Sequence, residues 1–337
     1  MSRIGLDARS TRQMSVGMKA YASQLAARLP GVAPENEYIA FTRGGNFGYD
    51  EQVRLPLAMR GARLDLMHFT TLYVPAIAPV RSVITIHDLI HLRFPQYFKS
   101  KVAPYYHTLV RWACARARRV ITDDDRTIDD LQHFLGVDRR KVRVVPLGVD
   151  ERFFAAVAPA AAPRPYVLYV GNHRAHKNLA TLFDAWSALP QELGVDLYLT
   201  GPDDFGGELQ RLRRSDRQVV ALGDVSTEAL IGYYAGALAL ALPALAEGFG
   251  LPMLEAMAAG CPVIASAQAA PSALSGAALL FAARDSGQLR SRLESIVRDD
   301  ALRARLSEQG RAVAARLTWD RCARATADIY REVLEES

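Results

Sequence analysis

Two glutamates, Glu247 and Glu255, stand eight residues apart around a glycine-containing turn and a short helical pattern. The turn is Gly248-Phe249-Gly250, Leu251-Pro252 opens the helical pattern, and Gly260 ends it. Glycines let a ligand approach the backbone, and a helix N-terminus offers free N–H groups and a positive dipole end, so this stretch suits an anion. The two glutamates add acceptors for hydroxyl groups. The pattern therefore predicts a ligand that is both polyhydroxylated and anionic, as a nucleotide-sugar is.

The full stretch, EGFGLP-x-LEAMAAG-x-PV over residues 247–263, resembles the E-x7-E motif of the retaining glycosyltransferases of family 4 (GT4). The resemblance implies an α/β chain with the GT-B fold, in which two Rossmann-like, doubly wound domains face a central cleft. The alternative is an ordinary strand-to-helix turn that carries a surface glutamate. The length of the match favours the family.

A second motif follows the apolar strand pattern at Tyr166–Val170, in the sequence GNHRAHKN over residues 171–178. It resembles the family's stretch from a glycine to an Arg/His-Lys-Asn triplet, in which a cation holds the diphosphate of the sugar donor. We assign that cation to Lys177. The alternative is a lysine on a surface loop. The resemblance also places these residues around the donor: Gly171, Arg174, His176 and Asn178.

The family resemblance also implies which other residues in the second half of the chain contact the donor. Glu255 would bind the ribose hydroxyls, while Glu247 and the N–H groups of Phe249, Gly250 and Leu251, next to Gly248, would hold the sugar hydroxyls. The nucleotide base would lie against the loop Gly223-Asp224-Val225, which follows the strand pattern Val219–Leu222.

In the first half, Gly17 and His87 are the candidate site residues. Gly17 lies between the strand pattern Arg3–Ala8 and the helical pattern Met18–Leu29, and it matches the family glycine that faces the diphosphate. A simple strand-to-helix loop is the alternative. His87 ends the strand pattern Val83–His87, at the sheet edge where ligands gather in α/β folds. It resembles the family histidine beside the transferred sugar, with Asp88 expected to fix its tautomer, and a structural histidine is the alternative.

The sequence departs from the family pattern at three places. Asp123-Asp124-Asp125 stands where many members have Ser-Glu, and Ala244 and Ser272 replace a serine and a glutamate. Three adjacent acids are hard-cation ligands, but they also suit the N-terminus of the helix predicted over Thr127–Leu135. We favour the capping role and expect no metal in the site.

Residues 89–122 contain no Asp or Glu and combine basic with aromatic side chains. The basic residues are Arg93, Lys99, Lys101, Arg111, Arg116, Arg118 and Arg119, and the aromatic ones are Phe94, Tyr97, Phe98, Tyr105, Tyr106 and Trp112. Such a segment suits an anionic membrane or a lipid-diphosphate acceptor. The alternative is a core helix with solvated arginines on its outer face.

The composition sets the broad class of protein. A length of 337 residues with half of them hydrophobic suits two domains, and no apolar run reaches the ~18 residues of a membrane span. The N-terminus lacks a signal-peptide pattern, and three scattered cysteines favour reduced thiols. The net charge of +5 comes without any nucleic-acid motif. We expect a cytoplasmic protein, peripheral on the inner face of the membrane if segment 89–122 makes contact, and no nucleic-acid partner.

The expected domains are residues 1–158, an N-terminal acceptor-binding domain, and residues 159–317, a C-terminal donor-binding domain. An Ala/Pro-rich linker over 155–165 separates them, and a last helix over 318–337 would return to the first domain. Further strands are predicted over residues 38–42, 64–69, 120–122, 142–146, 196–200, 238–242, 263–265 and 277–281. One or two helices are predicted over residues 289–317.

The resemblance implies transfer of a hexose, with GDP-mannose as the first donor to try, onto a glycan or lipid-diphosphate-linked acceptor in polysaccharide or lipopolysaccharide synthesis. No cofactor is expected, and His87, Glu247 and Lys177 would be the catalytic residues. Three other functions stay open. They are a non-catalytic sugar-nucleotide-binding subunit, a sugar-nucleotide epimerase or phosphorylase of similar architecture, and a dinucleotide oxidoreductase, although G-x-G-x-x-G is absent.

Overall fold

The computed structural model describes residues 1–9, 11, 14–100, 102–202, 204–205, 207–212 and 217–336. Lys101 of the basic segment and residues 10, 12 and 13 of the expected loop before Gly17 lie outside these residues. The chain divides into two compact units, residues 1–148 with 317–337, and residues 149–316. The first unit ends earlier than the expected boundary at residue 158, because residues 151–154 contact helix α10 of the second unit.

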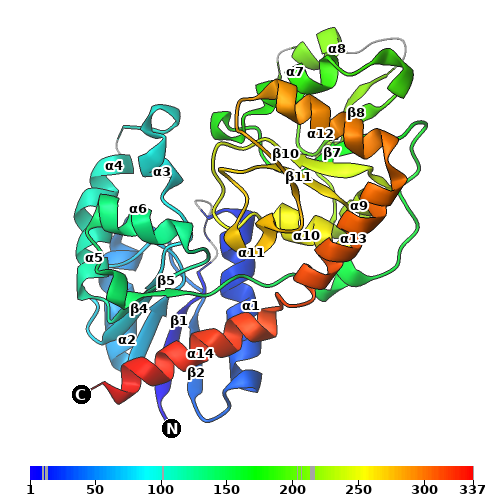
Figure 1. Ribbon diagram of the computed structural model, residues 1–337. Coiled ribbons are helices and arrows are strands. Elements are labelled where there is room, and N and C mark those ends of the chain that lie inside the picture. Colours follow the sequence, from blue (N-terminus) through cyan, green and yellow to red (C-terminus); the bar gives the residue numbers. More distant parts are fainter. Residues whose placement is uncertain are drawn as a thin grey trace. The chain divides into compact units, whose positions relative to one another are not determined.

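The first unit is a parallel six-stranded sheet with the strand order β2-β1-β3-β4-β5-β6. Its strands are β1 (Arg3–Asp7), β2 (Glu37–Phe41), β3 (Leu66–Phe69), β4 (Arg81–Thr85), β5 (Arg119–Thr122) and β6 (Val142–Val144). The helices α1 (Val16–Val32) and α14 (Trp319–Glu335) pack together on one face of the sheet (Figure 1). The last helix, α14, thus belongs to the first compact unit.

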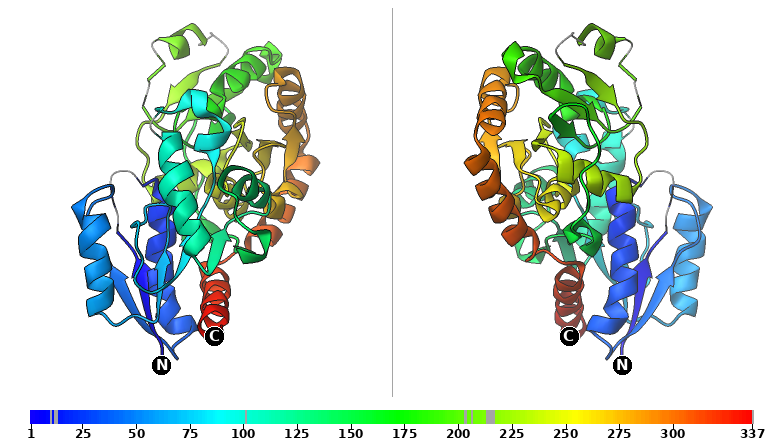
Figure 2. Two further views of the ribbon diagram at one scale, coloured as in Figure 1. Left: turned by 90° about the vertical axis from the view of Figure 1, so that its left-hand side faces the viewer. Right: turned by 90° about the vertical axis from the view of Figure 1, so that its right-hand side faces the viewer.

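The remaining helical elements of the first unit are short, as the blue-to-green part of the chain in Figure 2 shows. They are η1 (Asp50–Arg54), α2 (Leu55–Gly61), α3 (Ile90–Arg93), η2 (Pro95–Tyr97), α4 (Val102–Tyr105), η3 (Tyr106–Val110), α5 (Arg111–Arg116), α6 (Arg126–Leu135) and η4 (Arg139–Lys141). Side chains of α2, η3, α5 and α6 share one apolar core with β3 and β4. Segment 89–122 thus holds the short elements α3 and η2, followed by an unbroken helical run over residues 102–116 that α4, η3 and α5 form together.

The second unit is a parallel six-stranded sheet with the order β12-β11-β10-β7-β8-β9. Its strands are β7 (Tyr166–Tyr169), β8 (Asp196–Leu199), β9 (Val219–Ala221), β10 (Ala239–Leu242), β11 (Val263–Ser266) and β12 (Leu279–Phe281). The strands β7, β8, β10 and β11 are buried throughout, as expected of a parallel sheet covered on both faces.

Helices pack on both faces of this second sheet (Figure 1). The helix α7 (Leu179–Ser187) contacts α12 (Ser286–Arg298), and α10 (Leu251–Ala259) contacts both α9 (Thr227–Gly236) and α13 (Asp300–Ala314). The remaining helical elements are η5 (Glu151–Phe154), η6 (Ala175–Lys177), η7 (Gln191–Leu193), α8 (Glu208–Leu212) and α11 (Ser272–Ser275). The region expected to hold one or two helices over residues 289–317 holds parts of two, α12 and α13.

Each sheet has a switch point, where the chain reverses the direction in which it adds strands. It lies between β1 and β3 in the first unit and between β7 and β10 in the second. In open α/β sheets, ligands bind outside the carboxyl ends of the strands at such points. The strand orders therefore indicate one candidate binding edge in each unit.

Two local features explain how α14 joins the first unit. A Cβ atom at Gly148 would overlap the backbone of Thr318 and Trp319, so glycine lets the start of α14 approach. Further along, the Tyr330 hydroxyl lies 2.6 Å from Nδ1 of His68, whose Nε2 lies 2.8 Å from the Thr85 hydroxyl. Since all three side chains are fully buried, these bonds satisfy groups that would otherwise be costly to bury.

Within the described residues, all twelve expected strands are present. Two boundaries matter for the site. The helix α1 begins at Val16, with Ser15 as its N-cap, so Gly17 lies in the first helical turn rather than in a loop before it. The strand β4 ends at Thr85, so His87 lies two residues beyond it. Among the described residues, no helix has both the length and the apolar character needed to cross a bilayer.

Candidate functional site

The central charged pair of the second unit is Lys177 with Glu247, whose Nζ and Oε1 atoms lie 2.5 Å apart. Lys177 ends η6 in the loop after β7, and Glu247 lies in the loop after β10. The pair therefore spans the two strands of the switch point. The side chains are 14% and 13% exposed, so the pair is shielded but still reaches the surface. Two residues that separate motifs had singled out thus meet at one place.

Hydrogen bonds join the two loops on either side of this pair. The Leu245 N–H donates to the His176 carbonyl oxygen at 2.8 Å, and the Asn178 side-chain amide donates to the Pro243 carbonyl oxygen at 3.0 Å. Asn178 has a left-handed backbone (φ 56°), which asparagine tolerates better than most residues. The His176 side chain is buried, whereas Arg174 is exposed. Of the two residues expected beside Lys177, Arg174 is thus the one open to a ligand.

The glycine that opens this motif, Gly171, is held by its neighbours. Its φ of 149° favours glycine, and its N–H donates to the Thr200 hydroxyl at 3.1 Å. His173, which sequence reasoning did not single out, lies 2.6 Å from an Asp204 carboxylate oxygen and 2.8 Å from the Thr200 carbonyl oxygen. It therefore links the loops after β7 and β8. The signal that the sequence offered was its place in the GNHRAHKN stretch beside the expected donor residues.

The helix α10 begins and ends at residues with left-handed backbone. Gly250 is the N-cap (φ 71°) and Gly260 the C-cap (φ 80°), where the Arg311 guanidinium donates to the Ala259 carbonyl oxygen at 3.0 Å. The first N–H groups of a helix have no carbonyl one turn earlier to bond to. Here Pro252 has no N–H and the Met253 N–H donates to the Gly250 carbonyl oxygen at 2.8 Å, so Leu251 is the first-turn residue whose N–H the helix end presents. Phe249 is buried, so its side chain belongs to the core and does not face a ligand. The turn therefore offers backbone donors next to Glu247.

Glu255 lies on α10 in a partly buried position. Its Oε2 is 3.3 Å from the Tyr234 hydroxyl, which also lies 3.2 Å from the Pro252 carbonyl oxygen. Burial raises the pKa of Glu255 from 4.5 to about 7, the Tyr234 hydrogen bond lowers it, and the charge of Asp150 raises it. Near neutral pH the carboxyl group is thus partly protonated, and it can both donate to and accept from hydroxyl groups.

The expected base-binding loop is part of a backbone pairing between two glycines. Gly223 (φ 69°) and Gly201 (φ 93°) form an antiparallel bridge, with N–H to oxygen distances of 2.8 and 3.1 Å. Asp224 is exposed and Val225 is partly exposed. The pairing fixes the loops after β8 and β9 at the carboxyl edge of the sheet.

In the first unit, His87 is bonded through both ring nitrogens. Its Nδ1 lies 2.7 Å from Oδ2 of Asp123, and its Nε2 lies 3.2 Å from the Thr70 carbonyl oxygen. The Tyr21 ring packs edge-on against it, with ring centroids 4.9 Å apart. His87 is 8% exposed. The imidazole is therefore held in a single orientation.

The expectation that Asp88 fixes this ring is wrong, because Asp88 accepts instead from the Ile90 N–H at 3.0 Å. Asp123 takes the role, since β4 and β5 pair in parallel with Thr85 opposite Ile121, which brings residues 87 and 123 side by side.

The helix-capping role of the acidic triplet is only partly right. Asp124 accepts from the Arg126 N–H and pairs with its guanidinium, whereas Asp125, at the N-cap of α6, makes no side-chain capping bond. Within the described residues, no group of three or more His, Cys, Asp or Glu side chains is arranged to hold a metal.

These bonds determine how many protons the His87–Asp123 pair holds. A carbonyl oxygen only accepts, so Nε2 carries a proton, and a second proton lies between Nδ1 and the Asp123 carboxylate. Burial lowers the pKa of His87, but the Asp123 charge and hydrogen bond raise it by more, and the net pKa lies above 6.5. An imidazolium beside a carboxylate fits both observations. His87 then acts as a hydrogen-bond donor rather than as a base.

Removing the Asp123 charge tests this assignment. We expect Asp123→Asn to lower the pKa of His87, because an opposite charge at this distance favours the charged imidazole. The shift is measured by NMR titration of the imidazole signals, with His87→Gln used to assign the resonance. Asp88→Asn is the matched control and should produce a smaller fall. Equal effects of the two variants would contradict the pairing.

A second test uses the raised pKa of Glu255. The folded protein binds the proton of the Glu255 carboxyl group more tightly than the unfolded chain does. The contribution of this proton to the free energy of unfolding is therefore complete below about pH 4.5 and is lost as the pH rises through about 7. Glu255→Gln should therefore lose less thermal stability than the wild type between pH 5 and pH 8, by on the order of 1–3 kcal/mol. Melting temperatures at the two pH values measure this. Glu294→Gln, which removes a surface carboxylate, should behave like the wild type, and parallel pH curves for all three proteins would refute the assignment.

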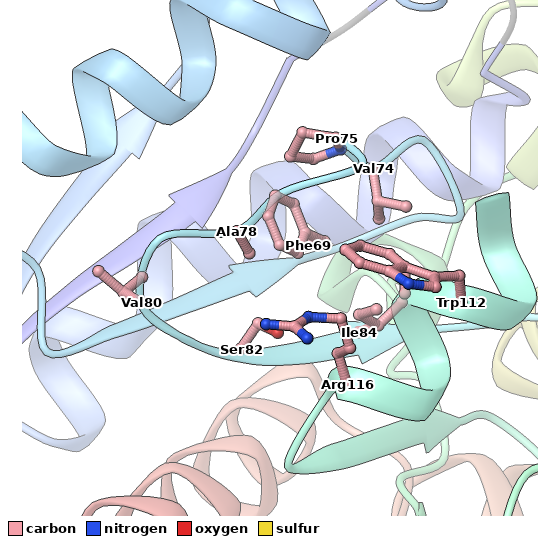
Figure 3. Close-up of a pocket in the computed structure, with 10 residues that line it drawn as sticks. Phe69, Val74, Pro75, Ala78, Val80, Ser82, Ile84, Trp112 and Arg116 are labelled. Carbon is pink, nitrogen blue, oxygen red and sulfur yellow. The ribbon is translucent and has the colours of Figure 1, made fainter.

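A small cavity of about 60 Å³ lies in the first unit. It is bounded by residues 74–80, the strands β3 and β4, and α5, and Figure 3 shows Trp112 and Arg116 facing the strand residues Phe69 and Ile84 across it. The Arg116 guanidinium lies 4.9 Å from the centre of the Trp112 ring. The exposed side of α5 thus combines an aromatic and a basic group.

Comparison with known proteins identifies the family of the chain. The family model described as Glycosyltransferase Family 4 matches residues 18–153, and the model described as Glycosyl transferases group 1 matches residues 164–299. The chain is 25% identical over 290 residues to O-antigen chain mannosyltransferase B of Escherichia coli, which covers 81% of this chain and 76% of the relative.

Solved structures match the fold over nearly the whole chain. Sucrose-phosphate synthase from Thermosynechococcus elongatus has a TM-score of 0.77 at 21% identity and covers 100% of both chains. Anabaena HepE, solved in complex with UDP-glucose, has a TM-score of 0.72 at 16% identity, covering 98% of this chain and 100% of its own. Two family models that together span most of the chain, two Rossmann-like sheets and these GT-B neighbours lead to one conclusion: the chain belongs to the group 1, family-4 glycosyltransferases.

Proposed function

We propose that this protein is a retaining glycosyltransferase that moves a hexose from a nucleotide-diphosphate sugar to a hydroxyl of a glycan or lipid-linked saccharide. The observation that carries the proposal is the Lys177–Glu247 pair in front of the N-terminus of α10. It joins a fixed cation, a carboxylate and backbone donors at the switch point of one sheet. A sugar diphosphate needs these groups together.

Charge develops on the diphosphate as the glycosidic bond breaks, and groups fixed in place stabilise it most in the transition state. In the proposal, the Lys177 ammonium and the α10 N–H groups bind the diphosphate oxygens. Glu247 then accepts from the sugar hydroxyls, and Glu255 contacts the ribose. His87, whose two ring nitrogens already bond to Asp123 and Thr70, contributes the positive charge of its ring near the transferred sugar.

Retention of configuration is proposed through attack on the face that the leaving group departs from, with the leaving phosphate oxygen taking the acceptor proton. We assign no covalent nucleophile, because the diphosphate is already an acidic leaving group. The paired-carboxylate chemistry of glycosidases is therefore not required. Mannose is the first candidate sugar, since the relative from Escherichia coli is named a mannosyltransferase.

A transfer assay on two variants tests the proposal. Lys177→Ala should lower kcat by about 10²–10³ and weaken the thermal shift caused by a nucleoside diphosphate. Glu247→Ala should abolish transfer but keep that shift, because its partner is the sugar rather than the diphosphate. Arg290→Ala, which removes a cation on α12, is the control and should match the wild type. Transfer at the wild-type rate by either of the first two variants would refute the proposed site.

Metal independence is a further part of the proposal. Lys177 and the N-terminus of α10 would neutralise the diphosphate without a divalent ion, and Asp123 and Asp124 are engaged with His87 and Arg126. We expect EDTA to leave the transfer rate essentially unchanged. Loss of activity on chelation, with recovery on adding Mg²⁺ or Mn²⁺, would favour a metal site instead.

We also propose a peripheral position at the inner face of the membrane, through segment 89–122. Arg111, Trp112, Arg116 and Arg118 are exposed, whereas Tyr106, Val110, Ala113 and Cys114 of the same segment are buried in the core. A basic and aromatic outer face favours anionic lipid. Co-sedimentation with vesicles containing anionic lipid, lost on Trp112→Ala with Arg116→Ala, would support this contact. Unchanged binding by the double variant would exclude this face.

A further inference from the structure

The switch point of the first unit holds a buried arginine, Arg9, which lies just beyond β1. Its guanidinium donates to the two Asp7 carboxylate oxygens at 2.8 and 2.7 Å, to the Gly45 carbonyl oxygen at 3.0 Å and to the Tyr73 carbonyl oxygen at 3.1 Å. Only 2% of the side chain is exposed. Arg9 therefore ties the loops after β2 and β3 to the end of β1, and charge-assisted bonds of this kind are the stronger ones.

A second residue joins the same two loops. The Gln52 side-chain amide donates to the Val74 carbonyl oxygen at 3.3 Å and accepts from the Ala76 N–H at 2.8 Å. The Asp50 carboxylate accepts from the Gly45 N–H at 3.2 Å. The loops after β2 and β3 thus form one fixed surface at the carboxyl edge of the sheet.

Three aromatic rings meet on this surface, and we call Phe47, Tyr73 and Tyr105 the aromatic cluster. The Phe47 ring packs edge-on against Tyr73 and Tyr105, with centroids 5.2 and 5.0 Å apart. The Tyr105 hydroxyl donates to the Leu72 carbonyl oxygen at 3.2 Å. Phe47 stays 54% exposed. The two tyrosines therefore support a ring that faces outward.

Phe47 also has a backbone conformation that phenylalanine rarely adopts. Its φ is 64°, in the left-handed region where bulky residues are outliers. Such conformations persist where the surroundings enforce them, and they gather at ligand-binding sites. The nearby Gly44 and Gly45 could adopt a left-handed backbone without strain. Yet it is Phe47, with its exposed ring, that adopts this conformation. Packing alone does not account for this, since more than half of the side chain contacts no protein.

We propose that the aromatic cluster binds a sugar ring of the acceptor saccharide, with Phe47 against the apolar C–H face of the ring. This inference rests on the proposed function, which requires a saccharide acceptor. An aromatic ring offers a large rigid surface at low entropic cost, and the C–H face of a pyranose is its uncharged complement. The position at the switch point of the first unit is where an α/β sheet binds ligands.

Saturation-transfer NMR on the full chain tests the inference, with the methyl glycosides of mannose, glucose and galactose as probes. With the wild-type protein, we expect saturation to reach the ring C–H protons of at least one glycoside. Phe47→Asn removes the ring while its asparagine tolerates the left-handed backbone. It should weaken that binding about 2–12-fold, the range expected for one aromatic contact. Phe47→Tyr keeps an aromatic ring and should bind the glycoside as the wild type does.

Tyr49→Asn is the matched control, because Tyr49 lies on the same loop and is 67% exposed. It should bind as the wild type does. Equal binding by Phe47→Asn and wild type, or no binding of any glycoside to the wild type at millimolar concentration, would overturn the inference. Displacement of the glycoside by decyl phosphate would also overturn it, in favour of a lipid site.

The thermal shift with a nucleoside diphosphate separates this inference from the proposed function. That shift belongs to the second unit, so Phe47→Asn should retain it. A wild-type protein that binds the glycosides through Phe47 but shows no nucleotide shift would refute the proposed function and leave the saccharide site standing.

Discussion

The Lys177–Glu247 ion pair is the interaction on which the rest of the account depends. A charged pair placed at the carboxyl ends of two adjacent strands is useful only if the two loops keep their geometry. The bonds from Leu245 to His176 and from Asn178 to Pro243 provide that, because they join the loops on both sides of the pair. The left-handed cap at Gly250 then directs the N-terminus of α10 to the same edge. Fold and chemistry are connected through these few backbone contacts.

The first unit repeats this logic with different residues. Its switch point is stabilised by the buried Arg9, which bonds to three segments at once, and His87 is held by Asp123 from the neighbouring strand. In both units a polar side chain just beyond a strand is fixed by a loop that follows another strand. Parallel sheets produce such pairs naturally, because the carboxyl ends of their strands share one edge.

Much of this could be predicted from the sequence, and the reason is the strength of local patterns. Buried strands such as Tyr166–Tyr169 and helix boundaries such as Gly250 and Gly260 depend on neighbouring residues. The partner of His87 could not be predicted in this way. Asp88 is adjacent in the sequence, but its carboxylate turns to the first turn of α3, while the pairing of β4 with β5 brings Asp123 to the ring. Arg9 and Phe47 escaped notice for a similar reason, since most of the groups that hold them, Tyr73 among them, come from distant loops.

The central claim is that Lys177 and the N-terminus of α10 hold one diphosphate together. A crystal structure of the full chain with a bound nucleoside diphosphate tests this most directly. The account predicts phosphate oxygens within about 3 Å of the Lys177 ammonium and of a first-turn N–H group of α10. A diphosphate bound away from both, with the Lys177–Glu247 pair undisturbed, would contradict it.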